Sequence, residues 1–261
     1  MLLAIDVGNT NSVFAVMERD GTIRSQWRLA TDVARTADAY AFSTAWFLGQ
    51  KHLDLSAIDA ACIACVAPAA LRPLRFFIEK YLPNVSAPLV VGADLMPSGP
   101  IAVDYPEEVG ADRLANAEAA TRLYPNRACV VIDFGTATTF DVIDGKGVYQ
   151  GGVIVPGVET AMHSLRGAAA KLPDAGFARP SRVVGKNTLG ALTSGMFYGY
   201  LSMAEGLVAR IRDEMREDFL VVATGGLAEI YADCGTLIDE CDADLTVKGM
   251  YYMYARHVSS T

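Results

Sequence analysis

The stretch LAIDVGNTNSVFAV, residues 3–16, decides the fold, because residues 130–143, VVIDFGTATTFDVI, repeat its design. In both, a run of strand-forming residues meets Asp, one apolar residue and Gly, and a few small residues lead into a second strand. Asp6 of the first stretch thus corresponds to Asp133 of the second. Two unrelated hairpins would favour two-residue Asn-Gly or Asp-Gly turns, and neither stretch has this form. A repeat about half the chain apart predicts two similar domains that face each other.

Composition and charge narrow the class of protein. Of the 261 residues, 52% are hydrophobic and 20% are charged, which is typical of a folded globular protein. The net charge of −8 argues against a nucleic-acid partner, since such a surface needs clustered Lys and Arg. No segment has the roughly 20 apolar residues that span a bilayer. The amino terminus also lacks the basic region of a signal peptide. We therefore expect a cytoplasmic protein with no membrane partner.

The five cysteines do not form the even set expected of a disulfide framework. Cys62 and Cys65 have C-x-x-C spacing, which also occurs in redox and zinc sites, but no second cysteine pair accompanies them. They lie in a strand-like run, where a spacing of three puts the two thiols on opposite faces. A buried strand is therefore favoured over a redox or metal site.

Strand-like and helix-like segments alternate along the chain, which predicts an α/β protein. The predicted strands lie at 2–17 (two strands and a turn), 22–29, 58–67, 87–92, 127–133 and 219–226. The predicted helices lie at 36–51, 69–82, 111–124, 193–216 and 227–234, with a last helix near the end of the chain.

The two Asp-x-Gly turns have the chemistry of a polyphosphate site. Glycine lets backbone approach a ligand closely, and successive N–H groups form an anion-binding concavity. Small polar side chains add donors in both turns: Thr10, Asn11 and Ser12 in the first, and Thr136, Thr138 and Thr139 in the second. Asp6 and Asp133 would repel phosphate alone, but a divalent cation turns such an acid into a ligand. Two such turns from facing domains would hold a nucleoside triphosphate.

Three motifs resemble the acetate and sugar kinase, Hsp70 and actin superfamily. DVGNT (6–10) and DFGTATTF (133–140) are similar to its phosphate motifs, and VVATGGLA (221–228) is similar to its adenosine motif. The resemblance implies an α/β fold of two similar ribonuclease H-like (actin-like ATPase) domains, with mixed sheets flanked by helices. We expect these domains at residues 1–113 and 114–261.

Four further stretches resemble type III pantothenate kinases, and with the motifs above they cover nearly the whole chain. They are PEEVGADRLANA (106–117), GGVIVPGVETAMHSL (151–165), VGKNTLGALTSGMFYGY (184–200) and DADLTVKG (242–249). The resemblance implies ATP-dependent phosphorylation of pantothenate, the first step towards coenzyme A. It also implies a cytoplasmic homodimer that requires Mg²⁺ and a monovalent cation, K⁺ or NH₄⁺.

Asp112 is the candidate general base, and the resemblance gives it the same role. Phosphoryl transfer depends on alignment and charge neutralisation, and a carboxylate accepts the hydroxyl proton as the new bond forms. We expect Asp112 in the first turn of a helix, where the macrodipole would lower its basicity. Arg113 offers a planar fork for the carboxylate of an acidic substrate. The alternative is that Asp112 caps the helix and Arg113 forms a solvated ion pair.

The resemblance implies roles for the remaining site residues. ATP and its phosphates are assigned to Asp6, Gly8, Asn9, Thr10, Asn11, Ser12 and Thr136. Pantothenate is assigned to Gly110, Ala111, Asp112, Arg113 and Thr188. Asp6 would hold Mg²⁺ through phosphate or water, and Asp133 the monovalent cation. For Thr188 a helix cap is an equal alternative.

Two other features leave the function open in detail. Val103 stands where most members of the family carry a tyrosine, so no substrate contact is assigned to it. Gly195 and Gly199 lie four apart, which predicts close helix packing in the core or at a dimer interface.

Two other functions fit the same scaffold, a non-catalytic regulator and an ATP-switched binding protein. The complete set of acidic site residues argues against the first, and the short chain against the second.

Overall fold

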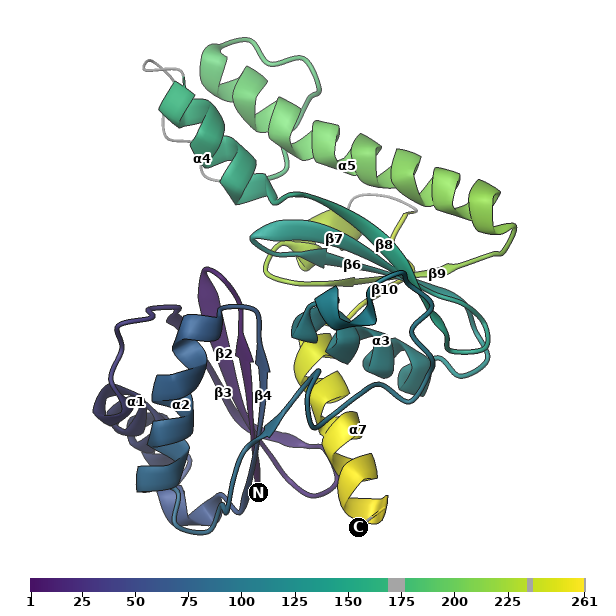
Figure 1. The fold of residues 1–261 in the computed structure, drawn as a ribbon. Helices are drawn as coiled ribbons and strands as arrows, with labels where there is room; N and C mark the ends of the chain where they lie inside the picture. The colour runs from purple at the N-terminus through teal and green to yellow at the C-terminus, as the bar shows by residue number, and fades with distance from the viewer. Residues whose placement is uncertain (169–176, 234–236, 261) are drawn as a thin grey trace. The chain divides into compact units, whose positions relative to one another are not determined.

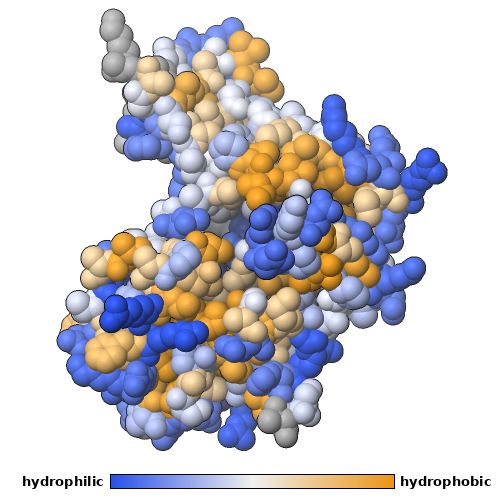
Figure 2. Space-filling view, in the orientation of Figure 1, coloured by the Kyte–Doolittle hydropathy of each residue, from blue (hydrophilic) through white to orange (hydrophobic). Residues whose placement is uncertain are grey.

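The computed structural model describes residues 1–168, 177–233 and 237–260 (Figure 1). Two compact units make up the chain: unit 1 contains Met1–Leu123 and Asp244–Thr261, and unit 2 contains Tyr124–Ala243. Hydrophilic side chains are spread over the visible surface, with hydrophobic patches between them (Figure 2). Within the described ranges, no helix combines the length and apolarity that a membrane span requires.

Unit 1 is built on a five-stranded mixed sheet with the order β3-β2-β1-β4-β5. The strands are β1 (Leu2–Val7), β2 (Asn11–Met17), β3 (Ile23–Ala30), β4 (Ala60–Cys65) and β5 (Leu89–Val90). β1, β2 and β3 form an antiparallel meander, and β4 and β5 add in parallel. The predicted strands in this half of the chain are therefore confirmed.

Helices cover both faces of this sheet (Figure 1). The helices are α1 (Ala37–Gly49), α2 (Pro68–Tyr81), α3 (Ala111–Leu123) and α7 (Leu245–Ser260), with short 3-10 turns η1 (Leu55–Ala57) and η2 (Pro106–Glu108). α1 begins where predicted, because the Thr36 side chain accepts a hydrogen bond from the backbone N–H of Ala39.

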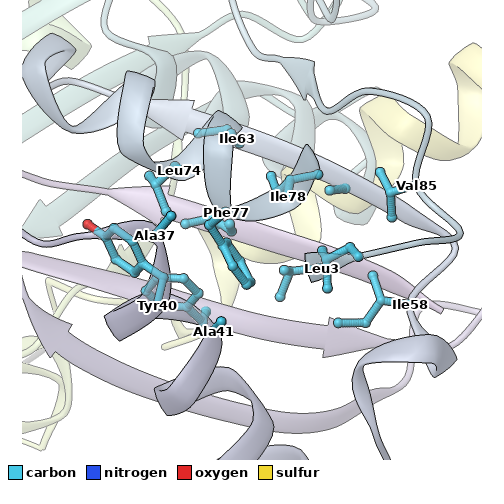
Figure 3. Packing of buried hydrophobic residues seen from close by; sticks show 14 of the residues in the cluster. Leu3, Ala37, Tyr40, Ala41, Ile58, Ile63, Leu74, Phe77, Ile78 and Val85 are labelled. Atoms are coloured by element: carbon cyan, nitrogen blue, oxygen red, sulfur yellow. The ribbon is translucent and has the colours of Figure 1, made fainter. Parts of the chain in front are cut away.

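The core on the α1 and α2 face is apolar and aromatic (Figure 3). Tyr40 of α1 and Phe77 of α2 lie with their ring centroids 6.2 Å apart, in the same cluster as Leu3 and Ile63 of the sheet. Ile63 and Phe77 are fully buried, and burying such a side chain contributes about 1.5–3 kcal/mol.

On the other face, α3 and α7 cross at very short range. A Cβ added at Gly249 of α7 would lie 1.8 Å from the backbone oxygen of Ala115 in α3. Beside this crossing, the Thr246 hydroxyl donates to the buried Asn116 side chain at 2.8 Å. The last helix therefore belongs to unit 1, and the boundary expected after residue 113 falls inside α3.

Unit 2 repeats the plan of unit 1, with the strand order β10-β9-β6-β7-β8. The strands are β6 (Cys129–Phe134), β7 (Ala137–Ile143), β8 (Tyr149–Pro156), β9 (Leu220–Thr224) and β10 (Glu240–Cys241). β6, β7 and β8 form an antiparallel meander, and β9 and β10 add in parallel. Even the register shift recurs, between Val16 and Met17 in β2 and between Val142 and Ile143 in β7. The predicted pair of similar α/β domains is confirmed.

The helices of unit 2 differ most from expectation. They are α4 (Val158–Ala168), α5 (Thr188–Met215) and α6 (Ala228–Ala232). α5 begins at Thr188, five residues before the predicted start at 193, because Asn187 caps it. α4, β8 and β10 were not predicted. An added Cβ at Gly195 or Gly199 would meet nothing within 4 Å, so these glycines are not sites of close packing in the described part of the chain.

The crossing of α3 and α7 gives a stability test. We expect Gly249→Ala to lower the free energy of unfolding by about 3 kcal/mol, because the new methyl group must push two backbones apart. Gly49→Ala is the matched control, since its Cβ would meet nothing within 4 Å at the end of α1. It should leave stability unchanged or raise it slightly. Urea denaturation measures both, and equal midpoints for the two variants would contradict the packing argument.

Candidate functional site

The β1–β2 turn presents polar side chains around a tight backbone. The N–H of Gly8 donates to the backbone oxygen of Asn11 at 3.0 Å. A Cβ at Gly8 would lie only 2.9 Å from that oxygen, so the turn has no room for a side chain there. Asn9, Thr10 and Asn11 are exposed, whereas Ser12 is 1% exposed. The phosphate-binding residues predicted at 8–12 thus lie together where β1 leads into β2. Among them, the Ser12 hydroxyl faces the protein interior.

Asp6 lies just before this turn, near the carboxyl end of β1, and is half-buried. Cys65 ends the neighbouring strand β4 and pairs in register with Val7. The pKa of the Cys65 thiol is raised mainly by burial and also by the nearby Asp6 carboxylate. Asp6 therefore lies at the edge of the sheet where β1 and β4 both end.

The C-x-x-C spacing belongs to β4 and has no redox or metal geometry. The Cys62 side chain is 0% exposed and packs on the α3 and α7 face, whereas Cys65 packs on the α1 and α2 face. Burial raises the pKa of the Cys62 thiol strongly. Both thiols are free, which confirms the prediction of a buried strand.

The start of α3 brings Gly110 and Asp112 into direct contact. A Cβ at Gly110 would lie 2.6 Å from Oδ1 of Asp112 and 3.5 Å from Val66. Val66 follows β4, and its N–H donates to the backbone oxygen of Val7 at 3.0 Å. The Gly110–Asp112 segment therefore lies at the same edge of the unit 1 sheet as the β1–β2 turn.

Asp112 lies within the first turn of α3, one residue after its start at Ala111. Its Oδ1 accepts a hydrogen bond from the backbone N–H of Arg113 at 2.8 Å. Burial raises the pKa of this carboxyl group, and the Arg113 N–H and guanidinium offset only part of the effect. The prediction that the helix dipole lowers its basicity is therefore wrong, because desolvation dominates. Asp112 is also not the residue that precedes the helix, as the capping alternative required.

In unit 2, the β6–β7 turn is closed by a hydrogen bond from Gly135 N–H to the backbone oxygen of Ala137 at 3.1 Å. Asp133 is half-buried near the end of β6 and pairs in register with Thr224 of β9. Gly225 follows β9 with φ of +90°, and a Cβ there would lie 2.4 Å from Oδ1 of Asp133. The Thr-Gly-Gly segment thus needs glycine to pass beside the second acid.

Thr136 is exposed in the second turn, and its backbone oxygen accepts two hydrogen bonds. One comes from Gly157 N–H at 2.9 Å, and the other from the Thr160 hydroxyl at 2.7 Å. A Cβ at Gly157 would lie 2.2 Å from the backbone oxygen of Gly135. Gly157 and Thr160 were not predicted from the sequence, although the Pro-Gly pair that ends β8 marks the position.

Thr188 is the exposed first residue of α5. The N-cap is Asn187, whose side chain accepts a hydrogen bond from Gly190 N–H at 2.7 Å. The capping alternative for Thr188 is therefore wrong by one residue.

Across the described ranges, no three His, Cys, Asp or Glu side chains gather as a metal site would require. Asp6 and Asp133 each offer a single carboxylate beside a glycine turn. Mg²⁺ is usually bound by one or two carboxylates together with waters and substrate phosphates. Asp6 fits that pattern, and Asp133 offers an oxygen ligand of the same kind in unit 2.

Comparison with solved structures supports the fold. The chain is similar to a putative Baf family transcriptional activator from Campylobacter jejuni, with a TM-score of 0.62 and 17% identity over 98% of this chain and 99% of that chain. It is also similar to a putative N-acetylglucosamine kinase from Porphyromonas gingivalis, with a TM-score of 0.52 and 14% identity over 100% of both chains. Identities this low carry the fold alone.

Comparison with curated sequences gives the family. The model of the type III pantothenate kinase family matches residues 2–210. The type III pantothenate kinase of Paramagnetospirillum magneticum is 47% identical over 258 residues, which is 98% of each chain. That of Phenylobacterium zucineum is 46% identical over 257 residues, again 98% of each chain. The chain therefore belongs to the type III pantothenate kinase family.

Proposed function

We propose that the protein transfers the terminal phosphoryl group of ATP to the hydroxyl of pantothenate, the first step of coenzyme A biosynthesis. The half-buried Asp112 carboxylate, which lies at the start of α3 and at the same sheet edge as the β1–β2 turn, is the observation that carries this proposal. The near full-length similarity to type III pantothenate kinases supports it.

Asp112 accepts the proton of the pantothenate hydroxyl as that oxygen attacks phosphorus. A general base works best when its pKa lies close to the operating pH, and burial moves the pKa of Asp112 in that direction. The hydrogen bond from Arg113 N–H fixes one carboxylate oxygen. Gly110 leaves the space that this carboxylate needs.

The other polar residues bind the two substrates. Arg113 pairs with the pantothenate carboxylate through its planar guanidinium, and Thr188 adds a hydroxyl. Gly110 and Ala111 contribute backbone to the same substrate.

The β1–β2 turn around Gly8, Asn9, Thr10, Asn11 and Ser12 receives the ATP phosphates, and Thr136 adds a further contact to ATP. Asp6 would hold Mg²⁺ through phosphate or water, and the ion would supply charge neutralisation during transfer. Asp133 would hold K⁺ or NH₄⁺.

We also expect a cytoplasmic homodimer. Apolar side chains exposed on unit 2 support association with a second copy; they are Ile154, Leu165, Val183, Val184 and Leu189. The alternative, a non-catalytic regulator, gains no support from the low-identity likeness to a putative transcriptional activator. The net charge of −8 also argues against a nucleic-acid partner.

The role of Asp112 is tested with Asp112→Asn. We expect kcat to fall by about 10²–10⁴-fold, the usual contribution of a general base. ATP should still bind, as measured by titration calorimetry, since Asp112 is assigned to the acceptor hydroxyl. Undiminished turnover would remove Asp112 from the mechanism.

The same variant separates a lost base from a damaged fold. Because the folded-state pKa of Asp112 is raised above its unfolded value, the free energy of unfolding falls as the pH rises through that interval. Asn has no such penalty, so Asp112→Asn should melt no lower than the wild type at neutral pH. A lower melting temperature would instead assign the loss of activity to structure.

The raised pKa of Asp112 also predicts the pH dependence. We expect kcat/KM for pantothenate to fall on the acidic side at a pH clearly above 3.8, the ordinary value for Asp, as the base becomes protonated. Titration of the substrate carboxyl group makes its own contribution to the acidic side of the pH profile, and this contribution should persist in the residual activity of Asp112→Asn. The decrease caused by protonation of Asp112 should be absent in that variant, and its persistence would contradict the assignment.

The cation assignment is tested by exchanging K⁺ for Na⁺ at constant ionic strength. We expect activity to fall severalfold, because the Asp133 site is assigned to the larger ion. In Asp133→Ala the two salts should give equal rates. Equal rates in the wild type would contradict a K⁺ site.

A further inference from the structure

Thr31, the residue that follows β3, makes three hydrogen bonds to the first phosphate turn. Its backbone N–H donates to the backbone oxygen of Thr10 at 2.8 Å. Its hydroxyl donates to the backbone oxygen of Gly8 at 2.8 Å and lies 2.8 Å from the Ser12 hydroxyl. No motif singled out Thr31, yet one residue from outside the turn contacts three residues of it.

The number of protons available decides which hydroxyl is the donor in the hydrogen bond between Ser12 and Thr31. A threonine hydroxyl has one proton, and that of Thr31 goes to the oxygen of Gly8. Ser12 must therefore donate to Thr31 across the 2.8 Å between the two oxygens. Since the Ser12 side chain is 1% exposed and its proton is used, its hydroxyl is not a donor for phosphate.

The same bonds set the orientation of two peptide planes. The peptide bonds of the turn are trans, so each N–H points opposite to the preceding C=O. The oxygens of Gly8 and Thr10 both face Thr31. The N–H groups of Asn9 and Asn11 consequently point to the side of the turn away from Thr31. Backbone N–H groups that share one side of a turn in this way are available to an anion.

We propose that Thr31 is a positioning residue for ATP, which holds the Asn9 and Asn11 N–H groups towards phosphate, and that Ser12 acts through Thr31 rather than on the nucleotide. This inference rests on the proposed role of the β1–β2 turn in phosphate binding.

Unit 2 contains a corresponding arrangement. Gly157 is the residue that follows the third strand there, and its N–H donates to the oxygen of Thr136 at 2.9 Å. A threonine hydroxyl, that of Thr160, donates to the same oxygen at 2.7 Å. Anchoring by the segment after the third strand is therefore a feature of both turns.

The test uses Thr31→Val, which keeps the β-branched shape and removes the hydroxyl, and Thr31→Ser, which keeps the hydroxyl. We expect Thr31→Val to raise KM for ATP by roughly tenfold, the effect of one lost hydrogen bond of this kind. KM for pantothenate should stay within about twofold of the wild type. Thr31→Ser should restore the ATP value, and an unchanged KM for ATP in Thr31→Val would overturn the proposal.

A double-mutant cycle tests the role of Ser12. If Ser12 acts only through Thr31, Ser12→Ala combined with Thr31→Val should be no worse than Thr31→Val alone. If Ser12 binds phosphate directly, the two effects on ATP affinity multiply, and that part of the proposal is wrong. Ser12→Ala alone, with its own expected rise in KM for ATP, keeps the test open should Thr31→Val fail to fold.

Thr121→Val is the matched control, because the Thr121 hydroxyl is half-buried in the same unit and donates to a backbone oxygen at 2.9 Å. Its kinetics should match the wild type. Titration calorimetry with ATP alone separates the two proposals. If the wild type fails to phosphorylate pantothenate, the proposed function fails, while a weaker ATP affinity of Thr31→Val than of Thr31→Ser still supports the positioning role.

Discussion

In each Asp-x-Gly turn, a backbone oxygen accepts an N–H from the residue that follows the third strand of its sheet. Thr31 N–H to Thr10 measures 2.8 Å, and Gly157 N–H to Thr136 measures 2.9 Å. This bond joins the turn between the first two strands to the end of the third strand, so the turn cannot move independently of the sheet. An exposed polar turn is thereby fixed on a rigid element, as a precise binding site requires.

Most of the fold could be predicted from the sequence, because the information is local and repeated. Strand-forming runs flank both turns, and a duplicated motif predicts a duplicated domain. The agreement extends to the identical strand order and the matching register shifts of β2 and β7. Positions of helix ends were less predictable: α5 begins at Thr188 because Asn187 is its cap, and a capping residue one position away gives nearly the same pattern.

The site was predictable only where its residues are adjacent in the chain. Asp112 and Arg113 lie within one motif, and so do Asp6 and Gly8. Thr31 lies 23 residues from its partner Gly8 and has no local signature. The prediction of a lowered pKa for Asp112 was wrong for a similar reason. The helix dipole can be inferred from the local sequence, but desolvation depends on the whole fold.

Local structure alone does not account for a carboxylate at position 112. The side chain accepts the Arg113 N–H, and an asparagine oxygen could accept it without a partly desolvated charge. Burial raises the pKa of Asp112, so its ionised form lowers stability at neutral pH. A carboxylate supplies what the amide cannot, which is the capacity to take up a proton. The same desolvation that opposes folding would strengthen Asp112 in its proposed role as a base, and active sites commonly show this opposition between stability and reactivity.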